Sequence, residues 1–287
     1  MVRAPATSAN LGAGFDCLGL ALELWNEVVA TPGTLADDDA TNLILRAARA
    51  TYARVGAAYP GFQLRCTNRI IFNRGLGSSA AAIACGVLFA NACLGNPLDV
   101  SALVDLATAL EGHPDNVTPC LLGGVRVALL SEDGHVLQAP ITLGTPLTAV
   151  CFIPEHNVPT SHARTVLPPS VRMADAVFNV ARACLMVAAL SSGRTDLFAE
   201  ATRDRLHQPF RLPLFPAGAT LLDVALRAGA LGAYISGAGP TVLALCQNAG
   251  QVASVTDAFQ TSARALHVPG STLPLALTES GAHVVAT

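Results

Sequence analysis

The stretch Arg74–Ala81, RGLGSSAA, places two glycines and two serines directly before the apolar segment AIACGVLFANACLG. Glycine permits backbone conformations and close approaches that a side chain forbids, and serine is favoured at the start of a helix. The apolar segment ends at Gly95 with Pro97 just beyond, which is typical of a helix end. The sequence therefore predicts a glycine turn that leads into a helix capped by Ser78 or Ser79.

The start of such a helix can also bind an anion. Its first backbone N–H groups have no partner within the helix, and they lie at the positive end of the helix dipole. Phosphate oxygens would fit the N–H groups of Gly77 to Ala80, and a serine hydroxyl could contact Mg²⁺. The stretch matches neither G-x-x-x-x-G-K-[ST] nor G-x-G-x-x-G. Local chemistry therefore leaves two interpretations open, a capped turn and a phosphate site.

Outward from this stretch, glycine and proline punctuation and apolar periodicity predict a mixed α/β chain. The first half is expected to hold strands at 2–5, 18–30, 62–66, 70–72 and 123–130, with helices from an acidic cap at Asp37–Asp39 to Gly56, from 78 to 95 and from Asp99 to Gly112. The second half is expected to hold a strand ending at 153, a loop at 156–168, helices at 171–190, 196–206, 220–228 and 251–265, two strands around 235–245 and a final strand. A length of 287 residues favours two domains, which we place at 1–145 and 146–287.

Composition excludes several classes of protein. Hydrophobic residues make up 52% of the chain, yet no apolar run reaches the roughly 18 residues of a membrane span without a polar interruption. The first residues lack the apolar core of a secretory leader, so we expect a soluble, cytoplasmic protein that binds no membrane. All 17 basic residues are arginine, which excludes lysine-dependent chemistry and argues against a nucleic-acid surface. The 8 cysteines are scattered without a C-x-x-C pair, as reduced core thiols would be.

A second motif, EGHPDN at Glu111–Asn116, follows the predicted helix that ends at Gly112. A carboxylate in the last helical turn faces the negative end of the dipole, at a cost of about 0.3–1 kcal/mol unless a cation compensates. Glu111 is therefore a candidate Mg²⁺ ligand, and the alternative is a glutamate screened by water. His113 by itself is more typical of a loop or core histidine than of a catalytic one. The glycine loops NLGAGFD (10–16) and ISGAGPT (235–241) indicate only tight turns.

Five motifs in a fixed order resemble the GHMP kinase superfamily, and its homoserine kinase branch in particular. They span Pro5 to about Leu245 and read PATSANLGAGFDCLGLAL, RGLGSSAAA, EGHPDNVTPCLLGG, DRLHQPFR and SGAGPTVLAL. The resemblance implies an α+β fold of two domains, an N-terminal domain of the ribosomal protein S5 domain 2-like type and a C-terminal ferredoxin-like domain. Both nucleotide and substrate would lie between them.

The resemblance also implies a reaction. The γ-phosphate of ATP would be transferred to the side-chain hydroxyl of L-homoserine, giving O-phospho-L-homoserine for threonine biosynthesis, and a homodimer is implied as well. Two alternatives stay open: a related kinase for another small hydroxylated metabolite, and a non-catalytic sensor of nucleotide or amino acid.

Matching the family motifs residue by residue implies a nucleotide site. The triphosphate would be wrapped by Gly75, Leu76, Gly77, Ser78, Ser79 and Ala80, with Arg74 as the cation beside the loop. Ser79 and Glu111 would bind Mg²⁺, and Asn42 would hold the adenine end. The motifs depart from the family pattern at Ala13, Ile71 and Asn73, where proline, proline and glycine are usual.

The substrate site is implied in the same way. Asp16 would face the substrate ammonium group, and Arg164 and Arg211 would clamp its carboxylate as planar donor forks. The residues expected near the hydroxyl or lining the site are Asn10, Asn116, His113, Thr160, Gly237 and Gly239. Related kinases have an aspartate at the place of Asn116, and asparagine cannot accept a proton. We therefore expect catalysis by positioning and charge neutralisation, carried by Asn116, Asp16, Glu111 and Ser79.

Overall fold

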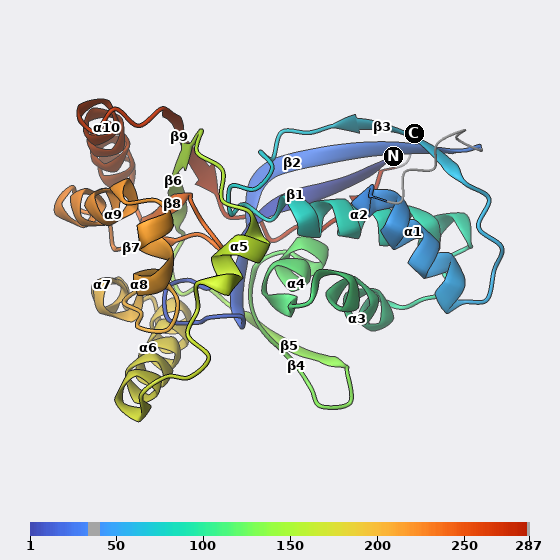
Figure 1. Cartoon of the computed structure of the whole chain (residues 1–287), viewed down its shortest axis with the longest axis horizontal. Helices are drawn as coiled ribbons and strands as arrows, with labels where there is room; N and C mark the ends of the chain where they lie inside the picture. The colour runs from blue at the N-terminus through green and yellow to red at the C-terminus, as the bar shows by residue number, and fades with distance from the viewer. Residues whose placement is uncertain (34–40, 286–287) are drawn as a thin grey trace.

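The computed structural model describes residues 1–33 and 41–285, which form two antiparallel sheets with helices packed on them (Figure 1). Four helices lie against the first sheet: α1 (Leu43–Arg54), α2 (Ser78–Cys93), α3 (Val100–Glu111) and α4 (Pro114–Leu122). The others accompany the second sheet or the connection to it: α5 (Thr160–Thr165), α6 (Met173–Ser192), α7 (Phe198–Ala201), α8 (Gln208–Arg211), α9 (Ala217–Arg227) and α10 (Ala249–Ala265). The 3₁₀ turns Thr195–Leu197 and Leu212–Leu214 complete the second group.

The first sheet has the order β10–β1–β2–β4–β5, with β3 also paired to β2. Its strands are β1 (Val2–Ala9), β2 (Leu18–Pro32), β3 (Phe62–Thr67), β4 (Val125–Leu130), β5 (Val136–Ile141) and β10 (His283–Val284). Seven of the eight β1 residues are buried, because β1 has a strand on each side and helix α2 packs against it. Burial on both faces explains why this strand lacks a clean polar alternation.

The second sheet has the order β7–β8–β6–β9, and its central strands β8 and β6 are buried along almost their whole length. Its strands are β6 (Thr148–Pro154), β7 (Gly232–Ile235), β8 (Val242–Cys246) and β9 (Gly270–Ala276). Successive side chains of a strand point to opposite faces. Val150 and Phe152 therefore pack with α9 and α10, whereas Cys151 and Ile153 join the large core shared with the first sheet. The two halves of the chain thus have a common apolar boundary.

The chain passes from the first sheet to the second between Ile141 and Thr148, which includes the position where we placed the domain boundary. It also returns. After β9, the segment Thr278–Val284 runs back along the first sheet, where Ala282 N donates to Cys120 O and β10 pairs with β1. A single boundary near residue 145 does not describe this return.

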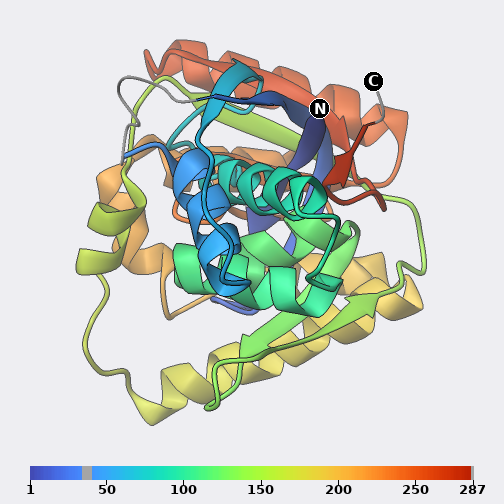
Figure 2. The ribbon, with the colours of Figure 1, turned by 90° about the vertical axis from the view of Figure 1, so that its right-hand side faces the viewer.

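Helix α6 is the one described helix that is long and apolar enough to cross a membrane by length and composition. Its mean hydropathy is 1.6 over 18 residues, although only 22% of that window is buried. The helix is joined to the domain by polar contacts in its middle, since Asn179 donates to Asp204 at 2.6 Å and Arg182 contacts Glu200. Figure 2 shows the β4–β5 hairpin running along α6, and Gly144 N donates to Leu190 O. These contacts are those of a domain helix with one exposed apolar face.

Several predicted elements are corrected by the structure. No strand forms at 70–72, because Ile70 and the residues after it turn into the glycine loop. Helix α4 was not predicted, since Gly112 and Pro114 indicated the end of the preceding helix, yet Pro114 occupies the first helical position of α4, where the missing N–H costs nothing. Helix α5 forms inside the predicted loop 156–168, and the predicted helix 196–206 ends at Ala201.

Two predicted helix caps also differ. Gly77, in the left-handed conformation, precedes α2, and no side chain caps this helix, so neither Ser78 nor Ser79 is a cap. The acidic cap at Asp37–Asp39 lies outside the described residues. Asn42 caps α1 instead, because its side-chain oxygen accepts from the backbone N–H groups of Ile44 and Leu45 at 3.0 and 3.3 Å.

Candidate active site

One cavity lies where the loops of both sheets meet the start of α2. Three glycine-rich segments reach it, together with the end of α3, the start of α4 and the short helices α5 and α8. Its lining residues are Asn10, Asp16, Asn73, Gly75, Gly77, Ser78, Ser79, Glu111, His113, Asp115, Asn116, Thr160, Arg164, Arg211, Gly237 and Ala238. Segments more than 200 residues apart in sequence therefore form one polar chamber.

The loop before α2 is built for close approach. Gly75 and Gly77 both have left-handed backbones, with φ of +76° and +69°. A Cβ atom at Gly75 would lie 2.2 Å from Ser236 O, and one at Gly77 would lie 1.9 Å from Thr7 Oγ1. Only glycine fits at both places. The loop thereby presents the free N–H groups at the start of α2 to the cavity, where an anion would be stabilised.

Ser79 and Glu111 bring two oxygens together beside that loop. Ser79 lies in the first turn of α2 and Glu111 at the last residue of α3, and Ser79 Oγ donates to Glu111 Oε2 at 2.6 Å. Hydroxyl and carboxylate oxygens are ligands that Mg²⁺ accepts, and at a metal–oxygen distance of about 2.1 Å two adjacent octahedral ligands lie about 3 Å apart. The donor set therefore fits a magnesium ion, and binding it would require this hydrogen bond to open so that the two oxygens move apart.

Asp16 and Arg164 form a two-point ion pair across the cavity. Arg164 Nη2 and Nη1 donate to Asp16 Oδ1 and Oδ2 at 2.8 and 3.0 Å. Burial lowers the pKa of Arg164, but the hydrogen bonds and charge of Asp16 outweigh burial and leave that pKa raised. The two side chains stay about one third exposed, at 34% and 36%. A ligand that carries both charges can therefore reach both partners.

Arg211, on α8, is held almost out of solvent at 4% exposure. Its Nε donates to Ala163 O at 3.3 Å, and its Nη1 donates to Gly237 O at 2.9 Å. Burial, followed by the nearby Arg164 charge, lowers the pKa of Arg211 to about 10, so the group stays cationic at neutral pH. Arg211 is a preorganised cation that connects three segments of the cavity wall.

The NLGAGFD loop is a run of left-handed residues that Asn10 holds together. Asn10, Leu11, Gly12 and Asp16 have φ of +74°, +44°, +81° and +56°. Asn10 Oδ1 accepts from Asp16 N at 3.0 Å, and Asn10 Nδ2 donates to Gly237 O at 2.9 Å. One buried amide thus sets the direction of the Asp16 carboxylate and ties the loop to the second sheet.

Asn116 and His113 lie at the start of α4, and Asn116 lies next to Gly77 of the loop before α2. Thr7 Oγ1 donates to Asn116 Oδ1 at 2.7 Å, and Asn116 Nδ2 has a long contact of 3.5 Å to Asp115 Oδ1, which leaves one amide hydrogen for another acceptor. His113 Nδ1 lies 2.8 Å from Asp115 Oδ1. Burial lowers the pKa of His113, but the hydrogen bond and charge of Asp115 outweigh it and leave that pKa raised.

Some residues expected at the site lie elsewhere. Arg74 points away from the cavity, because its guanidinium donates to the backbone carbonyls of Pro154 and Glu155. These bonds connect the loop before α2 to the end of β6. Asn42 serves as the α1 cap. The side chains of Leu76 and Ala80 are buried in the core, and Gly239 sits just behind Ala238. The other expected residues all line the cavity.

The cavity also holds residues that the sequence did not single out. Asp115 and Ala238 lie inside motifs that were already recognised, so their neighbours were the available signal. Asn73 lines the cavity with φ of +54° where the family pattern has glycine, and asparagine is among the residues that tolerate this conformation best. Thr7, which contacts the cavity residue Asn116, lies inside the first motif, but the sequence gave no sign of its role, because Asn116 is 109 residues away.

Comparison with known proteins defines the class. Residues 42–124 match the GHMP kinases N terminal domain, and residues 186–265 match the GHMP kinases C terminal domain. The fold is also similar to that of L. major mevalonate kinase, which superposes with a TM-score of 0.73 over 97% of this chain and 96% of that one, at 14% identity. The fold is that of a GHMP kinase.

Closer relatives narrow the class. The chain is 43% identical to the homoserine kinase of Moorella thermoacetica, with 86% of this chain and 87% of that protein covered. It is 40% identical to that of Synechococcus sp. over 99% and 97% of the two chains. The crystal structure of homoserine kinase from Cytophaga hutchinsonii matches with a TM-score of 0.88 at 29% identity, over 99% and 96%. The chain belongs to the homoserine kinase family.

Proposed function

We propose that this protein transfers the γ-phosphoryl group of ATP to the side-chain hydroxyl of L-homoserine and so forms O-phospho-L-homoserine, a step of threonine biosynthesis. One observation carries the proposal. An anionic side chain, Asp16, and two cationic ones, Arg164 and Arg211, face one cavity beside the Ser79–Glu111 pair. A zwitterionic amino acid beside a phosphate site matches this arrangement of charges. In this division of labour, residues 1–145 bind ATP and residues 146–287 complete the substrate pocket.

Substrate binding would exchange one ion pair for two. The ammonium group of the amino acid would replace Arg164 at Asp16. Its carboxylate would then bind the guanidinium group of Arg164 thus freed, together with that of Arg211. Arg211 has its Nη2 group left for this purpose, because Nε and Nη1 are already bound to the protein. A substrate that lacks either charge would leave one partner of the old pair unsatisfied.

The substrate hydroxyl would then lie at Asn116. Since Thr7 occupies the Asn116 oxygen, the amide hydrogen that does not face Asp115 can hold the hydroxyl oxygen in line with the transferred phosphoryl group. Asn116 has no basic atom, so the rate would come from positioning and from the N–H groups at the start of α2 acting on the phosphate oxygens, and the hydroxyl proton would pass late in the reaction to an oxygen of the transferred phosphoryl group. Mg²⁺ held by Ser79 and Glu111 would neutralise charge on the phosphates.

A substrate panel tests the proposal. The purified protein is given ATP and Mg²⁺ with L-homoserine, L-serine, L-threonine, mevalonate or galactose, and ADP release is measured. We expect release with L-homoserine to be far faster than with the others. Equal rates would refute the proposal, a preference for mevalonate or galactose would indicate a different metabolite kinase, and ligand binding without turnover would indicate a sensor.

We also propose a cytoplasmic homodimer. All eight cysteines are free, as suits a reducing compartment that contains ATP. The outer face of α6 supports self-association, because Met173, Val177 and Val180 are 79%, 60% and 64% exposed and uncharged. Sedimentation of Val180→Asp should show a monomer, whereas Val100→Asp, on the outer side of α3, should match the wild type. A monomeric wild type would refute the dimer.

A further inference from the structure

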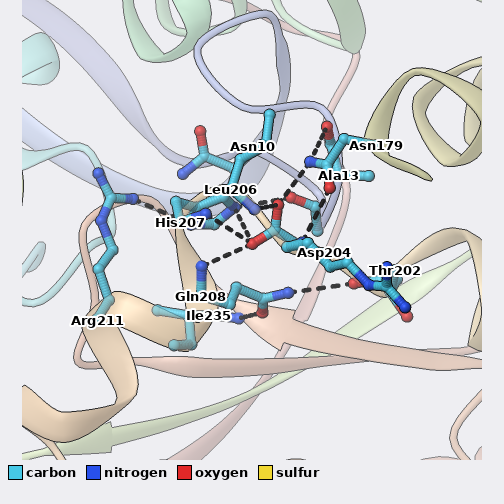
Figure 3. Close-up of polar contacts among 12 residues, drawn as sticks. Asn10, Ala13, Asn179, Thr202, Asp204, Leu206, His207, Gln208, Arg211 and Ile235 are labelled. Carbon is cyan, nitrogen blue, oxygen red and sulfur yellow. Dashed lines mark hydrogen bonds and ion pairs between the residues drawn. The ribbon is translucent and has the colours of Figure 1, made fainter. Parts of the chain in front are cut away.

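His207 is a buried side chain to which the catalytic scheme above gives no part. It has no solvent exposure and immediately precedes α8. Figure 3 shows it between the residues of the NLGAGFD loop and Arg211. The ring of Phe15 stacks on it, with centroids 5.1 Å apart and planes at 21°. The imidazole therefore lies between the two elements that carry the charges of the proposed amino-acid clamp.

The hydrogen bonds of His207 determine its protonation state. Nε2 lies 2.8 Å from Gly12 O, and a carbonyl oxygen can only accept, so Nε2 carries the hydrogen. Nδ1 lies 3.2 Å from Arg211 Nη1, and a guanidinium can only donate, so Nδ1 offers a lone pair. Only the neutral Nε2–H tautomer satisfies both partners. Burial, which favours the neutral ring, lowers the pKa of His207.

The charged groups that face His207 leave these two hydrogen bonds of the imidazole unchanged. Arg211 lies on one side, Asp16 lies further along the glycine loop, and the Asp204 carboxylate lies 3.6 Å from Nε2. Asp204 is fully occupied elsewhere. Its carboxylate accepts from Asn179 Nδ2 and from the N–H groups of Leu206, His207 and Gln208, at 2.6 to 3.0 Å (Figure 3). It thereby anchors the turn that directs the imidazole toward Gly12.

We propose that His207 is a positioning residue, a neutral spacer that fixes the distance and direction between Arg211 and the loop that bears Asp16. The inference rests on the proposed function. Gly12 and Asp16 belong to one left-handed loop, and Arg211 belongs to α8, a helix of only four residues that cannot hold its own orientation. The imidazole joins them by one donor and one acceptor at opposite corners of a rigid ring. An α-amino acid requires that spacing, because its two charges share one carbon.

Two substitutions separate the two hydrogen bonds. Glutamine places its amide nitrogen near the Nε2 position, so His207→Gln keeps the donor to Gly12 and loses the acceptor for Arg211. Asparagine places its oxygen near Nδ1, so His207→Asn keeps that acceptor and loses the donor. Each variant is measured with L-homoserine and with 3-aminopropan-1-ol, which is homoserine without its carboxylate.

We expect His207→Gln to raise KM for L-homoserine about 10- to 100-fold, the effect of a lost hydrogen bond to a charged group. Its KM for ATP and its kcat/KM for 3-aminopropan-1-ol should change less than about threefold. His207→Asn should lower kcat/KM for both substrates, because it loses the bond to Gly12 that holds the loop bearing Asp16. Equal losses for the two substrates in His207→Gln, or no change in either variant, would overturn the proposal.

The wild-type protein supplies the remaining controls. If it does not turn over L-homoserine, the proposed function and this inference fall together; if it does and the variants show no separation, only this inference falls. Should both variants fail to fold, histidine ¹⁵N NMR of the wild type decides. We expect His207 to give the neutral Nε2–H pattern from pH 5.5 to 8.5, and a protonated or Nδ1–H ring would refute the spacer.

Discussion

Asp16→Asn should reverse the charge preference of the substrate site. The wild-type carboxylate has two roles in our proposal, since it pairs with Arg164 in the free protein and with the substrate ammonium in the complex. Asparagine has the same shape and no charge. The substitution should therefore weaken the binding of a zwitterionic substrate and at the same time free Arg164 to bind an anionic one.

The magnitudes follow from the geometry. A hydrogen bond to a charged group contributes about 1.5–3 kcal/mol, so kcat/KM for L-homoserine should fall roughly 10- to 150-fold. The Asp16–Arg164 pair is about one third exposed, and exposed pairs contribute about 0.2–1 kcal/mol after screening by solvent. Releasing Arg164 should therefore raise kcat/KM for 4-hydroxybutanoate, which is homoserine without its amino group, by no more than about fivefold.

The assay is ADP release with each substrate, at low and at high ionic strength. Added salt should reduce the gain in kcat/KM that the variant shows over the wild type with 4-hydroxybutanoate. The reason is that the Asp16–Arg164 interaction lost in the variant is partly exposed and therefore screened. An equal loss with both substrates would mean that the Asp16 carboxylate only holds Arg164 and the loop in place and does not bind the substrate ammonium. An unchanged rate with L-homoserine would refute the ammonium site altogether.

Three further predictions concern the metal pair, the glycine loop and His113. Glu111→Gln should lower kcat about 10²- to 10³-fold, the loss seen when one electrostatic group is removed, and should leave ATP affinity by calorimetry within about threefold; full activity would refute the metal assignment. Gly77→Ala should lower activity sharply, because its Cβ would displace Thr7, whereas Gly56→Ala, with a similar φ of +71° and open space around it, should be active and cost only about 1–2 kcal/mol of stability. The raised pKa of His113 should add to the free energy of unfolding below about pH 6.5, and that contribution should be lost as pH rises through the folded-state pKa. Urea unfolding at several pH values should show this dependence in the wild type and not in His113→Gln, and parallel curves would contradict it.

Local signals predicted most of the elements. Apolar periodicity and the glycines at their ends indicated α2, α3, α6 and α10, because these helices are long and each has an apolar face or an apolar body. Local signals failed where a short segment owes its structure to distant contacts. Helices α4 and α5 contain prolines or polar residues that suggest turns, and burial of α4 against both sheet and helices overrides that preference.

The candidate site shows the same contrast between residues that the motifs indicated and contacts that they did not. Glycines, serines and the carboxylate Glu111 lie in motifs, and their chemistry could be inferred from residue type and order. Their partners could not. Arg74 directly precedes the glycines of the loop before α2 in sequence, yet its side chain donates hydrogen bonds to backbone carbonyls at the end of β6 in the second sheet.

The sequence by itself therefore determined the family, the two-domain plan and the residue types that a phosphate and an amino acid require, because these depend on short motifs and on composition. Only the tertiary structure decided which groups face one another. Thr7 with Asn116, Asp16 with Arg164 and Gly12 with His207 are 109, 148 and 195 residues apart. Hydrogen bonds act over about 3 Å of space and are indifferent to separation along the chain.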